Sequence, residues 1–221
     1  EGAEVEQYLA AVASYNERAE EPTAWQEVVY TGPDYLERMI GDRAGDLVVL
    51  AGNNRKKTNY ILESVKAGYH VLSDKPLAIC REDFDLLREA YAEARNHGVW
   101  ICDLMTERYD ALNILTRELM HDPDLFGELL PGTADNPSIA MRSIHHFFKS
   151  VSGQPLIRPA WYYDVEQQGE GIADVTTHLI DLVFWLSSPD WPDNCGTVVV
   201  VHPAGLRSVA VLPAVVRQTT V

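Results

Sequence analysis

Short apolar runs alternate with longer segments of mixed polarity over the first half of the chain. Four of these runs have the length of a β-strand, at residues 27–30, 46–51, 70–73 and 99–102. In the run 46–51, five apolar residues follow Asp46 without interruption, which is typical of a strand that is buried on both faces in a parallel sheet.

The segments between these runs carry apolar residues at helical spacing. Helices are predicted at residues 4–20, 35–40, 56–67 and 82–96. Gly68 and Gly98 follow the last two helices, at the position where a helix commonly ends in a left-handed conformation. The alternation of strand and helix from residue 27 to residue 103 predicts right-handed βαβ crossovers and a parallel sheet with helices on both faces.

This alternation stops after residue 103. The pattern then predicts a connecting helix at 109–120, β-leaning stretches within 138–151, a strongly apolar helix at 171–186, and valine-rich strands at 198–201 and 209–211. Pro203 and Pro213 exclude a long central strand in this last segment. We therefore predict an α/β fold, with an incomplete parallel-sheet domain at residues 1–121 and an α+β domain with a mostly antiparallel sheet at residues 122–221.

Charge and composition narrow the classes of function. The 33 acidic residues against 18 Lys and Arg give a net charge of -15, which repels phosphodiester backbones, so we expect no nucleic-acid partner. No run of about 18 apolar residues occurs, so we expect no membrane partner. The 3 cysteines form no C-x-x-C motif, which favours a reducing compartment and predicts a cytoplasmic protein. Export stays open because the chain begins at Glu1 with no leader in view.

Two loops follow predicted parallel strands, where such sheets bind their ligands. Gly52, Asn53 and Asn54 follow the strand at 46–51, and Asp74, Lys75 and Pro76 follow the strand at 70–73. Because proline disfavours helical geometry in the residue before it, the ammonium group of Lys75 is held at the strand end. A single lysine of this kind is more often a solvated turn residue, so the loop alone is a weak signal.

The apolar helix at 171–186 carries a polar pair at i, i+4 spacing, Asp174 and His178. On an α-helix these side chains share one face. A surface ion pair and a structural core histidine are the alternatives. Because the helix is apolar nearly all round, a buried pair must be compensated or functional, and acid–base chemistry is the function we predict.

Together these segments resemble the Gfo/Idh/MocA oxidoreductases, the family of glucose-fructose oxidoreductase and inositol dehydrogenase. Residues 46–77 are similar to the region that ends in the family's "AGKHVLCEKPLA" signature, and residues 161–186 are similar to its second signature, which contains D-x-x-x-H. The family residues are replaced at several places, by Asp74, Tyr162, Glu170 and Thr176.

This resemblance implies a Rossmann-type domain and hydride transfer between NAD or NADP and a sugar or polyol. It implies that Lys75, Asp174 and His178 are catalytic, with His178 as the base, Lys75 stabilising the alkoxide and Asp174 positioning its neighbours. It implies cofactor-binding roles for the two strand-end loops, Gly52, Asn53, Asn54, Asp74, Lys75 and Pro76. We expect no metal, and a homo-oligomer in the full-length parent.

The resemblance also implies that the first strand and its phosphate-binding turn lie upstream of Glu1, since no G-x-G-x-x-G follows a strand. The segment after Leu186 does not resemble the family's remaining C-terminal sheet, which is compatible with a frameshifted or foreign ending, so whether residues 187–221 are native to the family stays open. Three alternatives stay open: a glycosidase of this fold that uses NAD transiently, a cofactor- or sugar-binding protein without turnover, and a metal-dependent sugar enzyme. The metal ligands would then be His145, His146, Asp174, His178 and Asp181.

Overall fold

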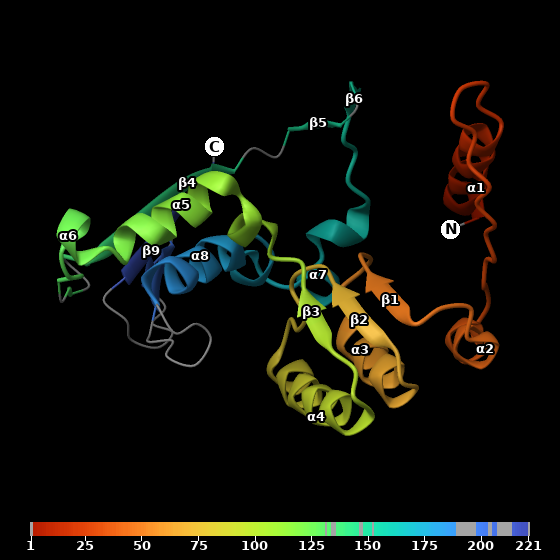
Figure 1. Ribbon diagram of the computed structural model, residues 1–221, viewed down its shortest axis with the longest axis horizontal. Helices are drawn as coiled ribbons and strands as arrows, with labels where there is room; N and C mark the ends of the chain where they lie inside the picture. Colours follow the sequence, from red (N-terminus) through yellow and green to blue (C-terminus); the bar gives the residue numbers. More distant parts are fainter. Residues whose placement is uncertain are drawn as a thin grey trace. The chain divides into compact units, whose positions relative to one another are not determined.

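The computed structural model describes residues 2–130, 132–133, 136–145, 148–151, 153–188, 198–202, 205–206 and 214–220 (Figure 1). The chain divides into two compact units, residues 1–45 and residues 46–221. Among the described residues, no helix is long and apolar enough to cross a membrane.

The first unit contains two helices, α1 (Gly2–Asn16) and α2 (Tyr35–Asp42). Asn16 at the end of α1 binds the following loop, donating to the carbonyl oxygen of Trp25 over 2.8 Å. The prediction of a strand at residues 27–30 is wrong, since the described residues of this unit form no strand. Within the unit these residues therefore have no neighbouring strand to pair with, and Val28 is 66% exposed.

The second unit begins with a parallel sheet of three strands, β1 (Leu47–Leu50), β2 (His70–Ser73) and β3 (Ile101–Asp103), in that spatial order. Leu50 pairs with Ser73, and Ser73 with Asp103, so the carboxyl ends of all three strands lie at one edge. Each loop that leaves this edge can therefore contribute to one site.

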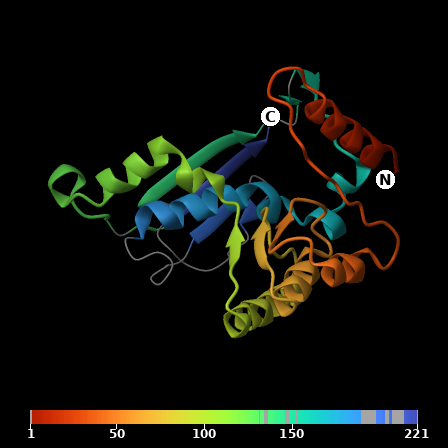
Figure 2. The same ribbon diagram turned by 45° about the vertical axis from the view of Figure 1, so that its right-hand side comes forward.

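Two helices connect these strands, α3 (Lys57–Lys66) and α4 (Arg81–His97), and they pack against each other on one face of the sheet (Figures 1 and 2). The prediction of helices on both faces does not hold for this pair. Because the strand order is sequential and crossovers are right-handed, consecutive crossover helices fall on the same side. Gly98 ends α4 with a φ of 68°, in the left-handed conformation expected of it.

The core of this sheet joins α3, α4 and β2. Its buried members are Ile61, Leu62, Val65, Val71, Ala90 and Ala94. On α4 the two alanines are four residues apart, so they lie on one face and their small side chains let α3 come close. This packing fixes the position of the strand ends, and with it the position of the two loops.

The remaining elements form the α+β part. They are η1 (Thr106–Tyr109), α5 (Ala111–Met120), α6 (Pro123–Phe126), β4 (Ile139–His145), β5 (Ser150–Val151), β6 (Gln154–Pro155), η2 (Ala160–Tyr163), α7 (Val165–Gln168), the π-helical η3 (Ile172–Thr176), α8 (Thr177–Ser187), β7 (Val198–His202), β8 (Gly205–Leu206) and β9 (Ala214–Thr220). Figures 1 and 2 show α5 and α8 side by side, with α8 lying along β4 and β9.

The second sheet has the order β4-β9-β7-β8. In its described residues β9 pairs in parallel with β4 and β7, while β8 is antiparallel to β7. The predicted fold class, a parallel α/β sheet followed by an α+β part, is confirmed, and the second sheet is mixed. β4 and β7 run in the same direction on either side of β9, which is possible because α8 lies in the connection between β4 and β7 and acts as a crossover. The strand predicted at 209–211 lies outside the described residues.

Candidate functional site

A cavity of about 620 Å³ opens at the carboxyl ends of β1 and β2. The two strand-end loops form one wall through Ala51, Gly52, Asn54, Asp74 and Lys75. Residues far along the chain form the rest of the wall, which consists of Glu107, Lys149, Arg158, Pro159, Trp161, Tyr162, Gln168, Asp174, Val175, His178, Leu179 and Leu182. The cavity therefore joins the parallel sheet to the helices of the α+β part.

Most of the residues predicted from the sequence meet in this cavity. Those that line it are Gly52, Asn54, Asp74, Lys75, Asp174 and His178. Asn53 is not among the lining residues, and its amide nitrogen donates to Oε1 of Gln167 over 3.0 Å. Pro76 lines a smaller neighbouring cavity, and the Lys75–Pro76 peptide bond is cis.

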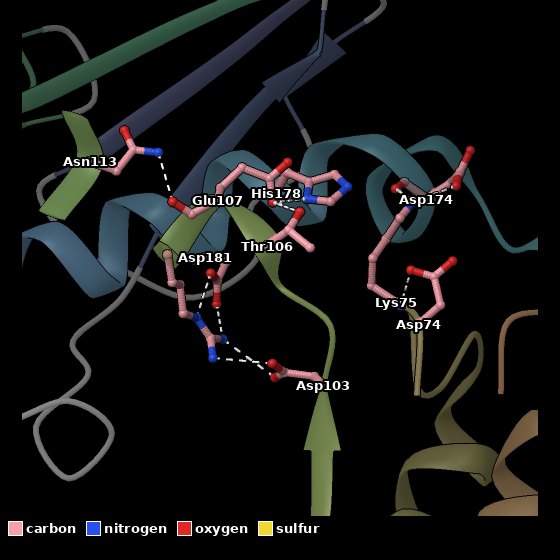
Figure 3. A network of polar contacts seen from close by, with 10 residues as sticks. Asp74, Lys75, Asp103, Thr106, Glu107, Asn113, Asp174, His178 and Asp181 are labelled. Carbon is pink, nitrogen blue, oxygen red and sulfur yellow. Dashed lines mark hydrogen bonds and ion pairs between the residues drawn. The ribbon is translucent and has the colours of Figure 1, made fainter. Parts of the chain in front are cut away.

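The carboxylate of Asp174 is the centre of a hydrogen-bonded cluster inside the cavity. Its Oδ1 accepts from Nζ of Lys75 over 2.8 Å and from Nε2 of Gln168 over 3.1 Å, and its Oδ2 accepts from the hydroxyl of Tyr162 over 2.8 Å. Lys75 also donates to the carbonyl oxygen of Asp174. Figure 3 shows Lys75 extending from the strand end toward Asp174. The ammonium group is thus held in one place by a partner 99 positions away.

These contacts determine the charge of Asp174. Burial has the largest single effect on its pKa and raises it, but the hydrogen bonds from Lys75, Tyr162 and Gln168 and the charge of Lys75 together lower the pKa below the usual value for an aspartate. Burial and the hydrogen bond to Asp174 raise the pKa of Tyr162 to about 12. At neutral pH the cluster therefore contains a charged carboxylate and a neutral phenol.

His178 has a different partner, Glu107 of η1. The two atoms Nδ1 and Oε2 are 2.8 Å apart (Figure 3). Because a carboxylate only accepts, this contact places a proton on Nδ1 and leaves Nε2 as the basic atom of the neutral ring. Glu107 can also stabilise the imidazolium ion once Nε2 takes up a second proton. Sequence reasoning missed Glu107, whose only signal is its place just after the third strand.

The predicted contact of Asp174 with His178 along one helix face does not occur, since each side chain binds a partner from another element. Asp174 lies on η3, where the backbone is π-helical before α8 begins at Thr177. The i→i+5 hydrogen bonds of a π-helix widen the turn, so residues four apart no longer lie in line. Both side chains still reach the cavity.

A buried lysine that the sequence did not suggest joins the two loops. Lys57, at the first turn of α3, is 1% exposed and donates to Oδ1 of Asn54 over 2.5 Å and to the carbonyl oxygen of Asp74 over 3.0 Å. Burial lowers its pKa to about 8, an effect that the charge of Asp74 partly offsets. In the sequence it follows Arg55 and Lys56, so it resembles a solvated helix start.

Behind the cavity, Arg108 joins β3 to α8. Its Nε donates to Oδ2 of Asp181 over 2.8 Å, and its Nη1 donates to Oδ1 of Asp103 over 3.1 Å. Asp181 is thus committed to an ion pair. In the part of the chain that the structure describes, no three His, Cys, Asp or Glu residues gather so that they could hold a metal ion. His146 lies outside the described residues.

The strand-end loops leave room for a bound ring. A Cβ atom on Gly52 would meet no atom within 4 Å, so there is open space over the loop after β1. Lys75, after β2, presents an ammonium group to the same space. Open space over a glycine loop at the carboxyl edge of a parallel sheet is where such folds bind their ligands, so a flat cofactor ring has room beside Gly52.

Two family models match the chain. Residues 2–102 match the Gfo/Idh/MocA model, described as "Oxidoreductase family, NAD-binding Rossmann fold", and residues 115–199 match a model described as "Putative oxidoreductase C terminal domain". The chain belongs to the Gfo/Idh/MocA oxidoreductase family. Its first sheet is of the Rossmann type, as the resemblance implied. The origin of the segment after Leu186, which the sequence left open, is settled as far as residue 199, since the second model matches up to that residue.

A curated protein and a solved structure that are similar to this chain are also described as a reductase and an oxidoreductase. The chain is 28% identical over 173 residues to the 1,5-anhydro-D-fructose reductase of Ensifer adhaerens, covering 77% of this chain and 45% of that protein. It is 50% identical to a crystal structure from Parabacteroides merdae described as a "putative oxidoreductase", covering 84% of this chain and 42% of that one, with a TM-score of 0.77.

A more distant structure shares the fold. The WlbA dehydrogenase of Bordetella pertussis, solved in complex with NADH and UDP-GlcNAcA, is 23% identical, with 82% of this chain and 44% of that one covered and a TM-score of 0.54. The chain thus spans less than half the length of all three relatives.

Proposed function

We propose that this chain forms the substrate-side half of an oxidoreductase site that transfers a hydride between NAD or NADP and a carbon of a sugar or polyol. One observation carries the proposal. The Lys75–Asp174 ion pair and the His178–Glu107 pair line a single cavity at the carboxyl edge of a Rossmann-type sheet. The oxidation of an alcohol requires a base that takes the hydroxyl proton and a positive charge beside the hydroxyl oxygen, and the basic imidazole and the ammonium group in this cavity can supply both.

His178 acts as the base. Its Nε2 takes the hydroxyl proton as the neighbouring C–H bond breaks, and Glu107 stabilises the imidazolium ion that forms. The hydrogen of that C–H bond leaves with its electron pair to C4 of the nicotinamide, which is the chemistry that the cofactor supplies when bound. The alcohol becomes a carbonyl, so one proton and one hydride leave the substrate.

Lys75 stabilises the oxygen on which negative charge develops. Its ammonium group is fixed by Asp174, so it need not reorganise during the reaction. Asp174, in turn, is held by Tyr162 and Gln168, so it keeps the ammonium group of Lys75 in position. The residues proposed to lie along the cofactor are Gly52, Asn53, Asn54, Asp74, Lys75 and Pro76.

The test is turnover in the longest natural chain that contains this sequence. A panel of sugars and polyols is offered with NAD and with NADP, and reduced cofactor is measured by its absorbance. We expect net reduction of one cofactor with at least one alcohol. Sugar release without net reduction would instead support the glycosidase alternative, and binding without either reaction would support a protein that only binds its ligands.

A further inference from the structure

The ionisable side chains of the cavity fall into two groups. Among the lining residues, Lys75 pairs with Asp174 and His178 with Glu107, while Asp74 accepts from the backbone nitrogen of Lys75 over 2.9 Å. Two cations remain in the described part of the wall, Lys149 and Arg158, and neither makes an ion pair with a described carboxylate. The wall carries three carboxylates, Asp74, Glu107 and Asp174, and three cations, Lys75, Lys149 and Arg158, so the positive charge is local to Lys149 and Arg158 and is not a net charge of the cavity.

These two cations stand out against the charge of the chain. With 33 acidic residues against 18 Lys and Arg, a lysine or arginine has many possible partners. Two cations that pair with no carboxylate of the described residues produce a local positive potential, which attracts an anion from solution. They belong to the part of the wall formed by Lys149, Arg158, Pro159, Trp161 and Tyr162, and none of these is a residue proposed to hold the cofactor.

The guanidinium group of Arg158 is already positioned. It lies 4.0 Å from the ring centroid of Tyr162, and the hydroxyl of the same ring donates to Asp174. Stacking on an aromatic face holds the guanidinium plane and leaves its N–H edges free for a bidentate partner, an arrangement that matches carboxylate and phosphate groups. Arg158 is thus one aromatic ring away from the ion pair that would stabilise the reacting oxygen.

We infer that Arg158 and Lys149 form a subsite for an anionic group on the substrate, so that the substrate is a sugar or polyol carrying a carboxylate or a phosphate ester. The inference rests on the proposed function for the place of the reacting carbon. If the reacting alcohol carbon lies beside Lys75 and His178, the rest of the substrate molecule can lie along Tyr162 and reach Arg158. The anionic group then selects the substrate and fixes which hydroxyl reaches His178.

The experiment compares three matched compounds in the longest natural chain that contains this sequence: a neutral hexose, the corresponding hexuronate and the corresponding hexose phosphate. We expect kcat/KM for one of the two anionic compounds to exceed that for the hexose by about tenfold or more, the scale of a hydrogen bond to a charged group. The better of the two anions identifies the source of the charge. Equal values for all three would overturn the inference.

Variants tie the preference to the subsite. Arg158→Gln and Lys149→Gln should each lower kcat/KM for the preferred anion about 10- to 100-fold and leave the neutral hexose within about twofold. Arg158→Lys should fall between wild type and Arg158→Gln, because it keeps the charge and loses the planar fork. Arg88→Gln is the matched control, since Arg88 is exposed on α4 and is absent from the cavity wall. A loss as large in Arg88→Gln would overturn the inference.

A binding measurement separates this inference from the proposed function. Calorimetric titration of the chain with the hexuronate and the hexose phosphate requires no turnover. If one anion binds and Arg158→Gln abolishes binding, yet no compound is oxidised, the subsite stands and the proposed reaction is wrong. If the neutral hexose is oxidised and Arg158→Gln changes neither binding nor rate for any compound, the reaction stands and the subsite is wrong.

Discussion

At the scale of single residues, the properties of Asp174 follow from three side chains that donate to it. Lys75 comes from the loop after β2, Gln168 from α7 and Tyr162 from η2, and together they offset the cost of burying the carboxylate. Because the pKa of Asp174 is lower in the folded chain than in the unfolded one, the ionised group stabilises the fold above the usual aspartate pKa. This stabilisation is lost as the pH falls toward the folded-state pKa.

Asp174→Asn should therefore change the pH dependence of stability. The free energy of unfolding at neutral pH should drop by roughly 1–3 kcal/mol, because Lys75 loses its charged partner. Below the usual aspartate pKa of about 3.9 the variant should lose stability less steeply than the wild type on further acidification. Urea denaturation over a pH series measures both effects.

The control for this prediction removes an equal charge elsewhere. Asp85 is exposed on α4, so Asp85→Asn changes the net charge without touching the cluster. If Asp85→Asn and Asp174→Asn gave the same pH profile, the effect would come from net charge, and the ion pair would not matter to stability.

The residues of the candidate site differ in how far the sequence could predict their roles. Lys75, Asp174 and His178 stand in motifs, so their meeting in one cavity was predictable from the resemblance. Glu107 and Lys57 stand in no motif, and each gains its role from an element distant in sequence or from burial. For these two, only packing turns an ordinary charged residue into part of the site.

At the scale of elements, the ends of helices were predicted from glycines that the backbone requires. Gly98 has a φ of 68° and ends α4, and a Cβ added there would meet no atom within 4 Å. Any cost of a side chain at this position is therefore due to backbone conformation and not to a clash. Residues other than glycine are less stable in this region by about 1 kcal/mol.

Gly98→Ala should accordingly lower the free energy of unfolding by about 1 kcal/mol. Gly45→Ala is the matched control, because Gly45 has equally open surroundings and no positive φ. It should leave stability unchanged or raise it slightly, through a less flexible unfolded chain. Chemical denaturation of both variants tests this, and an equal loss in the two would contradict the assignment of the cost to the left-handed conformation.

The π-helical turn η3 is an element that the periodicity of the sequence could not predict. The spacing of Asp174 and His178 assumes an α-helix, whereas the structure inserts a wider turn over Ile172–Thr176. Such turns are frequent at functional sites. Here the wide turn directs Asp174 to Lys75 and leaves His178 to Glu107, so two separate pairs replace one Asp–His pair.

At the scale of the whole molecule, the parallel direction of the three strands was predictable, because alternating strands and helices imply crossover connections. Their sequential order, which places α3 and α4 on one face, was not predicted. The segment 27–30 has the composition of a strand but no strand to pair with inside its unit. The strand order of the second sheet depends on pairing between segments that are far apart in sequence, and the local pattern of apolar residues does not determine such pairing. The domain boundary near residue 121 stays a prediction.

The central claim is that the two halves of the site, one at the end of β2 and one on α8, work as a unit. Lys75→Met and His178→Ala should each reduce turnover about 10²- to 10⁴-fold in the longest natural chain that contains this sequence, the usual scale for a positioned acid–base group. Affinity for the reduced cofactor should change little, because neither side chain is proposed to hold its phosphates.

The most direct measurement is kcat for these two variants and for the double variant, with the best substrate of the panel. If Lys75 and His178 stabilise one transition state, the double variant should lose far less than the product of the two single losses, because groups that act together are not additive. Two independent, multiplying losses would contradict a shared site, and an unchanged rate in His178→Ala would show that His178 is not the base.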